Sequence, residues 1–99
     1  MRLFEIRDRS GRMIYMTLER WHHIVEEHSD VVGSFDEIQA AIAYPTAMRR
    51  SDEEGVMLYF RYYKYGVSDK NYLLVIVKYL NGEGFVITSY FTDRLQGLP

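Results

Sequence analysis

Three histidines fall within seven positions of one short segment of the chain, at His22, His23 and His28. An imidazole can accept and release a proton near neutral pH, so histidine suits acid–base catalysis under those conditions. Because an α-helix turns by about 100° per residue, His23 and His28, five positions apart, would point about 140° apart. His23 is then expected on the polar side of a helix, and His28 on its apolar side near the end.

The spacing of these histidines does not favour a metal site. Zinc-binding histidines on a helix stand three or four residues apart, and the segment lacks the HExxH pattern. His23 and Glu27 are four residues apart and could share an ion, but the sequence supplies no third ligand, and such a pair is more typical of surface charge. The chain has no cysteine, which excludes disulfides, thiol catalysis and cysteine-ligated zinc. We therefore expect no metal and no cofactor.

Acid–base chemistry without a metal fits the cleavage of RNA. That reaction needs a base for the 2′-hydroxyl, an acid for the leaving 5′-oxygen, and a cation or hydrogen-bond donor for the phosphorane. His23 and His28 are candidates for the first two tasks. For His28 the alternative is an ordinary hydrogen-bonded histidine of the core, and for His22 a structural role is the preferred interpretation.

The composition is that of one small globular domain. The chain has 99 residues, a formal net charge of −2 and 47% hydrophobic residues. No stretch approaches the roughly 18 consecutive apolar residues of a membrane span, and the N-terminus lacks the apolar block of a secretory signal. We expect a cytoplasmic protein without a membrane partner. Its nine tyrosines can either fill a small core or stack on bases.

The histidines belong to the first of two helices predicted within residues 17–44, after a short β-hairpin in residues 1–16. Thr17 is a suitable N-cap for the first helix. The second helix is expected to begin with a capping box, in which Ser34 accepts from a backbone amide three residues on and Glu37 reaches back to Ser34.

Beyond Pro45 the hydrophobic period changes from 3.6 to 2, which predicts an antiparallel sheet in residues 46–93. Its long strands are separated by a polar turn at residues 66–71 and by Asn81–Gly82, a pair typical of a type I′ turn. The predicted fold class is α+β, with two N-terminal-half helices packed on one face of a four-stranded antiparallel meander that a short β-hairpin precedes. All 99 residues form a single domain.

Alternation along the strands predicts the two faces of this sheet. The more apolar set of the first long strand, Val56, Leu58 and Phe60, is expected under the helices. The open face should carry basic, hydroxyl and aromatic side chains: Arg61, Lys78, Arg94, Thr88, Thr92, Tyr59 and Tyr63. Because residues 56–80 are net basic, this face would attract anions, and we assign Arg61 and Lys78 to substrate binding, with Arg61 as the phosphate clamp. The alternative is an ordinary solvated face, which is also normally charged.

Three segments resemble one group of small phage and bacterial domains. They are WHHIVEEH at residues 21–28, the helix end AYP at residues 43–45, and the late strand VITSY at residues 86–90. These domains are the predicted nucleases of the Barnase–EndoU–colicin–RelE superfamily, which includes RelE-like toxin domains. The resemblance extends over residues 17–92.

The resemblance implies a metal-independent ribonuclease fold with its site on the sheet and at the sheet's edge. His23 and His28 match the helix histidines of the family, and Thr88 and Tyr90 match its final-strand motif, so these four are the candidate catalytic residues. If His28 faces the interface between helix and sheet and Thr88 faces the open side of the sheet, they can meet only at the edge of the sheet. The hypothesis is an RNA-cleaving toxin or prophage-derived nuclease, with an antitoxin or a second copy as protein partner.

The chain departs from the family pattern at Glu27, where a basic residue is common, and at Ser29–Asp30, where a Pro-Glu pair is usual. One alternative is therefore an inactive domain of the same fold that binds a protein, or itself, through the aromatic face around Tyr59 and Tyr63. Another is a structural remnant, in which His28 would be fully buried and bonded to the backbone.

Overall fold

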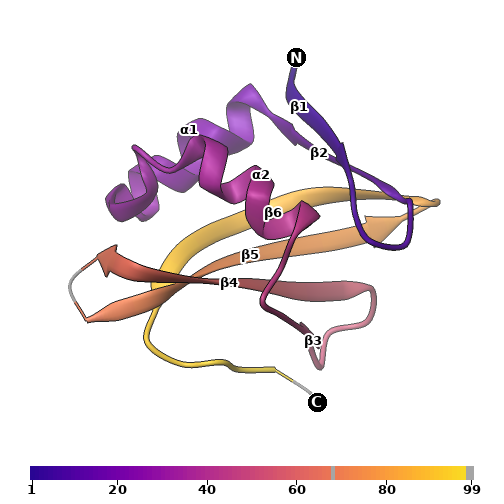
Figure 1. Cartoon of the computed structure of the whole chain (residues 1–99). Helices are drawn as coiled ribbons and strands as arrows, with labels where there is room; N and C mark the ends of the chain where they lie inside the picture. The colour runs from indigo at the N-terminus through magenta and orange to yellow at the C-terminus, as the bar shows by residue number, and fades with distance from the viewer. Residues whose placement is uncertain (68, 98–99) are drawn as a thin grey trace.

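The computed structural model describes residues 1–67 and 69–97, without the side chains of residues 65–67. Six strands form one sheet, and two α-helices and one 3-10 helix (η1) follow the second strand (Figure 1). In chain order the elements are β1 (Arg2–Arg7), β2 (Met13–Thr17), α1 (Leu18–Glu27), η1 (Ser29–Val31), α2 (Phe35–Ala43), β3 (Ala47–Arg50), β4 (Val56–Val67), β5 (Lys70–Leu80) and β6 (Glu83–Thr92).

The sheet is mixed, with the strand order β1-β2-β6-β5-β4-β3. Strands β2 and β6 are parallel, and the other neighbouring strands are antiparallel. The α+β class is therefore confirmed, but the predicted four-stranded antiparallel meander is wrong. The N-terminal hairpin does not precede a separate sheet. It extends the same sheet through the parallel pairing of β2 with β6.

Local sequence signals set some element boundaries correctly and one cap incorrectly. Thr17 caps α1, because its Oγ1 accepts a hydrogen bond of 3.2 Å from the Arg20 amide. Ser34 precedes α2, but its side chain makes no capping hydrogen bond, so the predicted capping box is wrong. With ψ at 26°, Ser34 lacks the extended backbone that aims an N-cap hydroxyl at the following amides.

The tight turn between β5 and β6 has the backbone that the sequence predicts. Asn81 and Gly82 both have positive φ, 56° and 84°, as a type I′ hairpin requires. The predicted turn at residues 66–71 falls partly on residue 68, which lies outside the described residues. Strand β4 extends to Val67 before residue 68, and strand β5 begins at Lys70 after it.

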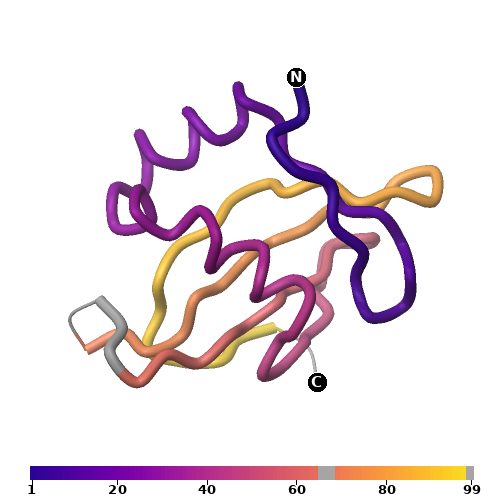
Figure 2. The backbone as a smooth tube through the Cα atoms, turned by 45° about the horizontal axis from the view of Figure 1, so that its top comes forward, coloured from indigo at the N-terminus to yellow at the C-terminus, as the bar shows by residue number. Residues whose placement is uncertain are grey.

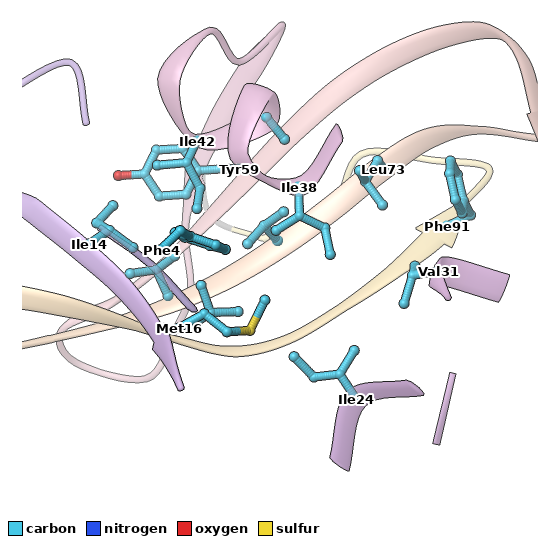
Figure 3. Close-up of a cluster of buried hydrophobic side chains, with 14 residues drawn as sticks. Phe4, Ile14, Met16, Ile24, Val31, Ile38, Ile42, Tyr59, Leu73 and Phe91 are labelled. Atoms are coloured by element: carbon cyan, nitrogen blue, oxygen red, sulfur yellow. The ribbon is translucent and has the colours of Figure 1, made fainter. Parts of the chain in front are cut away.

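The helices cover one face of the sheet and the main core lies between them and it (Figures 1 and 3). Ile24 of α1 and Ile38 of α2 are almost fully buried there, against Leu73 of β5 and Tyr59 of β4. Tyr59 therefore lies under the helices and not on an open face, and Tyr63 packs against the same core. The predicted orientation of β4 is inverted.

The opposite face is a second apolar cluster and not an open cationic surface. Val56, Leu58, Phe60 and Leu74 are buried in it. After β6 the chain runs back along this side (Figure 1), and Gly97 lies so close to Leu58 that an added Cβ would stand 2.7 Å from the leucine Cδ1. Because the C-terminal segment covers the part of the opposite face around Leu58, the more apolar residues of β4 did not have to face the helices.

The N-terminal hairpin is tied to the sheet by one buried carboxylate. Asp8 Oδ2 accepts hydrogen bonds from the hydroxyls of Tyr59 (3.2 Å) and Tyr79 (2.7 Å), and these two hydroxyls also bond each other. Asp8 Oδ1 accepts from the Ser10 hydroxyl and amide and from the Arg12 amide. Burial raises the pKa of Asp8, but these donors outweigh it and lower that pKa to about 2. Burial likewise raises the pKa of Tyr59 to about 12.

Strand β6 has an open edge along much of its length. Strand β2 pairs with β6 only at Ile14–Gly84 and Tyr15–Phe85, and then the chain turns into α1. The register between β5 and β6 shifts after Val86, which leaves Ile87 without a partner, as in a β-bulge. From Ile87 onward no other described strand pairs with the outer side of β6. Helix α1 runs along that side (Figure 2).

Candidate active site at the open edge of strand β6

His28 lies where α1 ends beside the open edge of β6. As the C-cap of α1 it has φ −134°, and its amide donates to the Ile24 carbonyl at 2.7 Å. Its ring stacks on the ring of Tyr90, with 4.8 Å between centroids and 29° between planes. The ring is half-buried, and its nitrogens have no hydrogen-bond partner among the described residues. The expectation for a structural remnant, a fully buried His28 bonded to the backbone, is therefore not met.

The His28–Tyr90 stack borders a hollow of about 520 Å³. Strand β6 contributes Tyr90 and Thr92, and the start of β5 contributes Lys70. The remaining lining residues come from the end of α1, from η1 and from the chain around Thr92: Glu27, Ser29, Asp30, Phe91 and Asp93. One cationic side chain thus faces three carboxylates here, beside a histidine and three hydroxyl groups.

A second hollow, of about 210 Å³, shares Glu27 and His28 with the first. It is lined by His23 and Arg20 on the α1 side and by Thr88 on the β6 side, with Ile24 and Ile87 between them. The His23 side chain is 64% exposed, and its Nε2 lies 3.9 Å from Glu27 Oε1. The four residues that the sequence analysis selected as catalytic candidates therefore line two adjoining hollows with His28 in both.

Two contacts hold this edge in place. Asp30 of η1 accepts a hydrogen bond of 2.9 Å from the Phe91 amide, so its carboxylate takes the place of a neighbouring strand. The Gln96 side-chain amide donates to the Tyr90 hydroxyl at 3.1 Å from the C-terminal segment. The first contact fastens η1, directly after His28, to the strand that carries Tyr90.

The residues predicted to bind substrate phosphates lie elsewhere. Arg61 is on the helix-bearing face, because it pairs with Leu73, and its Nη1 donates to the Tyr44 carbonyl at 2.5 Å. Lys78 is on the other face, where its Nζ donates to the Glu54 carbonyl at 2.7 Å. Neither lines either hollow. The prediction that one cationic face carries both is wrong, because it placed β4 with the wrong side toward the helices.

The sequence analysis missed Arg20, Lys70 and Asp30. Arg20, His23 and Glu27 follow one another at offsets of three and four, so helical spacing alone places Arg20 beside His23. Lys70 lies at the site because β5 pairs with β6, and no local sequence pattern predicts this position. Asp30 occupies a position where the chain departs from the family pattern, and only the structure shows its contact with β6.

The chemistry of the edge is that of proton transfer and hydrogen bonding. Two imidazoles can accept and donate protons, and the Thr88 and Tyr90 hydroxyls can donate hydrogen bonds to an oxyanion. Among the residues that the structure describes, no group of three or more histidine, aspartate or glutamate side chains is arranged to hold a metal ion.

Comparisons with protein-family models, with curated proteins and with solved structures find no match to this chain. The resemblance to the Barnase–EndoU–colicin–RelE superfamily therefore rests on the motif residues themselves. Within the described ranges, no helix is long and apolar enough to cross a membrane.

Proposed function

We propose that this chain is a metal-independent endoribonuclease domain that cleaves RNA at the open edge of β6. The observation that carries the proposal is the stack of His28 on Tyr90, in which the imidazole nitrogens stay free of hydrogen bonds within the described structure. In a purely structural core histidine, those nitrogens would form hydrogen bonds with backbone groups. Here they remain available to a substrate, between two hollows, the smaller of which Thr88 and His23 also line.

In the proposed reaction the substrate supplies the nucleophile. One imidazole takes the proton of the ribose 2′-hydroxyl, whose oxygen attacks the adjacent phosphorus. The bond from phosphorus to the 5′-oxygen breaks, and the other imidazole, protonated, gives its proton to that oxygen. A 2′,3′-cyclic phosphate and a 5′-hydroxyl result. His28 and His23 take these two roles, while Thr88 and Tyr90 orient the phosphate through their hydroxyls.

The test is cleavage of a labelled RNA oligonucleotide and of ribosome-bound mRNA, with and without EDTA. The wild type should yield 2′,3′-cyclic phosphate ends in both buffers. His28→Asn should lower the rate about 10²- to 10⁴-fold, the usual effect of losing a general acid or base. His22→Asn is the matched control, since His22 is exposed and lines neither hollow. The proposal fails if the wild type leaves both RNAs intact, or if His28→Asn cleaves as fast as the control.

A second candidate function is protein binding or homodimerisation through the face opposite the helices. It is supported by Tyr62, which is 50% exposed there with its ring edge-on to Tyr72. Tyr59 and Tyr63 cannot serve this function, since they pack in the main core. Under this alternative, light scattering should give a dimer that Tyr62→Glu converts to a monomer. A wild-type monomer that binds no protein would exclude it.

A further inference from the structure

Some basic side chains of this fold bond other groups of the chain, and others have no such partner among the described residues. Arg2, Arg12, Arg61 and Lys78, for example, each bond a carboxylate or a carbonyl of this chain. Among the described residues, the basic side chains without a hydrogen bond, ion pair or ring contact are Arg9, Arg20, Arg50 and Lys70.

Two of these unpaired cations stand at the candidate site, one in each hollow. Arg20 lines the hollow that holds His23 and Thr88, and Lys70 lines the hollow that holds Tyr90 and Thr92. The wall that the hollows share is Glu27 and His28. His28 therefore stands between two cations whose side chains form no ion pair or hydrogen bond within the described chain.

We infer that Arg20 and Lys70 bind the two phosphates that flank the scissile phosphate of a single-stranded RNA, which runs along the open edge of β6 with the scissile phosphate at His28. The inference rests on the proposed function and adds its substrate class, an oligonucleotide with phosphates on both sides of the cleaved bond. It also replaces Arg61 and Lys78 as the phosphate-binding residues.

The carboxylates of the site influence where a bound RNA strand can lie, but they do not prevent its binding. Asp30 is bonded to the Phe91 amide, and Asp93 lies 3.4 Å from the Arg94 guanidinium. Among the described residues Glu27 has only His23 as a partner, at 3.9 Å, and Glu27 lines both hollows. A polyanion is then attracted at Arg20 and Lys70 and repelled at Glu27. This charge pattern favours an RNA strand that passes from one hollow to the other over His28 and not over Glu27.

The distinguishing experiment measures binding without catalysis. The probe is a fluorescent 2′-O-methyl RNA octamer, which lacks the nucleophilic hydroxyl, and anisotropy gives Kd at several salt concentrations. Arg20→Gln and Lys70→Gln should each raise Kd about tenfold at low salt and reduce the salt slope by about 0.7. The double variant should reduce the slope by about 1.4.

The other two unpaired cations provide matched controls. Arg9 lies in the turn between β1 and β2, and Arg50 ends β3; neither lines the two hollows. Arg9→Gln and Arg50→Gln should leave both Kd and salt slope unchanged. Circular dichroism of every variant establishes that the fold is kept, since glutamine preserves helix propensity at position 20.

The outcomes separate this inference from the proposed function. If the wild type cleaves RNA while Arg20→Gln and Lys70→Gln bind the octamer like the two controls, the inference is overturned and the nuclease stands. If no RNA is cleaved but both variants lose affinity and slope, the phosphate path stands and the nuclease is overturned. A wild type that does not bind the octamer at low salt overturns the inference.

Discussion

Replacing Asp8 by alanine should destabilise the whole domain, although Asp8 lies in the N-terminal hairpin. Its carboxylate is the acceptor that connects the β1–β2 hairpin to Tyr59 of β4 and Tyr79 of β5. It also closes its own turn through the amides of Ser10 and Arg12. Asp8→Ala removes all of these contacts together, so we expect a large effect.

The contacts give the size of the effect. Without Asp8, the Tyr59 and Tyr79 hydroxyls can still bond each other, but one of the two protons loses its acceptor. One unsatisfied buried donor costs about 1–3 kcal/mol. Water can replace the carboxylate at the more exposed turn amides, so their loss adds about 1 kcal/mol. The free energy of unfolding should fall by about 3 kcal/mol, which lowers Tm by about 12–24 °C in a domain of this size.

The assay is urea unfolding followed by circular dichroism at pH 7. Asp52→Ala is the matched control, because Asp52 is exposed and, within the described part of the chain, its carboxylate accepts a hydrogen bond only from the Ser51 hydroxyl, at 3.4 Å. The control should stay within about 0.5 kcal/mol of the wild type. If Asp8→Ala unfolds at the same urea concentration as the control, the buried carboxylate does not fasten the hairpin, and this reasoning is refuted.

Three further predictions concern the same fold. The pKa of Asp8 falls from 3.8 to about 2 on folding, so the ionised carboxylate stabilises the fold above pH 4 and this stabilisation is lost as the pH falls toward 2. The free energy of unfolding of the wild type should drop by about 2 kcal/mol over that range, and Asp8→Asn should lack this loss in acid titrations. Gly84→Ala would place a Cβ 2.9 Å from Val77 Cγ1 and should cost about 1–3 kcal/mol in urea unfolding. At Gly33 an added Cβ would meet no described atom within 4 Å beyond its chain neighbours, so Gly33→Ala should stabilise by about 0.4–1 kcal/mol. Asp30→Ala leaves an amide of β6 without its acceptor; thermal melts should show a loss of about 1–2 kcal/mol, and no change would show that this bond does not hold η1 to the strand.

The elements that the sequence predicts correctly depend on short-range chemistry. Thr17 needs only an amide three residues away, and Asn81–Gly82 needs only two positive φ angles. The orientation of β4 depends instead on distant groups. Tyr59 can be buried under the helices because Asp8, far away in the sequence, accepts its hydroxyl, and Leu58 is covered on the other face by the C-terminal segment. Alternation separates the two faces of a strand but does not say which face the helices cover.

The candidate site likewise has residues that the sequence predicts and an arrangement that only the structure shows. The motif residues His28 and Tyr90 are visible in the sequence, and the structure brings their rings into contact at the edge of β6. The edge itself arises because β2 leaves the sheet early and a bulge at Ile87 changes the register. No pattern within one element records that arrangement. For this reason the sequence pattern predicts Arg61 rather than Arg20 as the phosphate-binding residue, and it does not indicate Lys70.

The proposed nuclease requires RNA to bind where the rings of His28 and Tyr90 meet. Its most direct test is an NMR titration of the assigned aromatic ring signals with a 2′-deoxy oligonucleotide, which cannot be cleaved. We predict that the His28 and Tyr90 ring signals shift in a saturable way, while those of His22 and Tyr44 do not move. Unchanged His28 and Tyr90 signals at saturating oligonucleotide, or shifts confined to Tyr62 on the opposite face, would show that RNA does not bind at this edge.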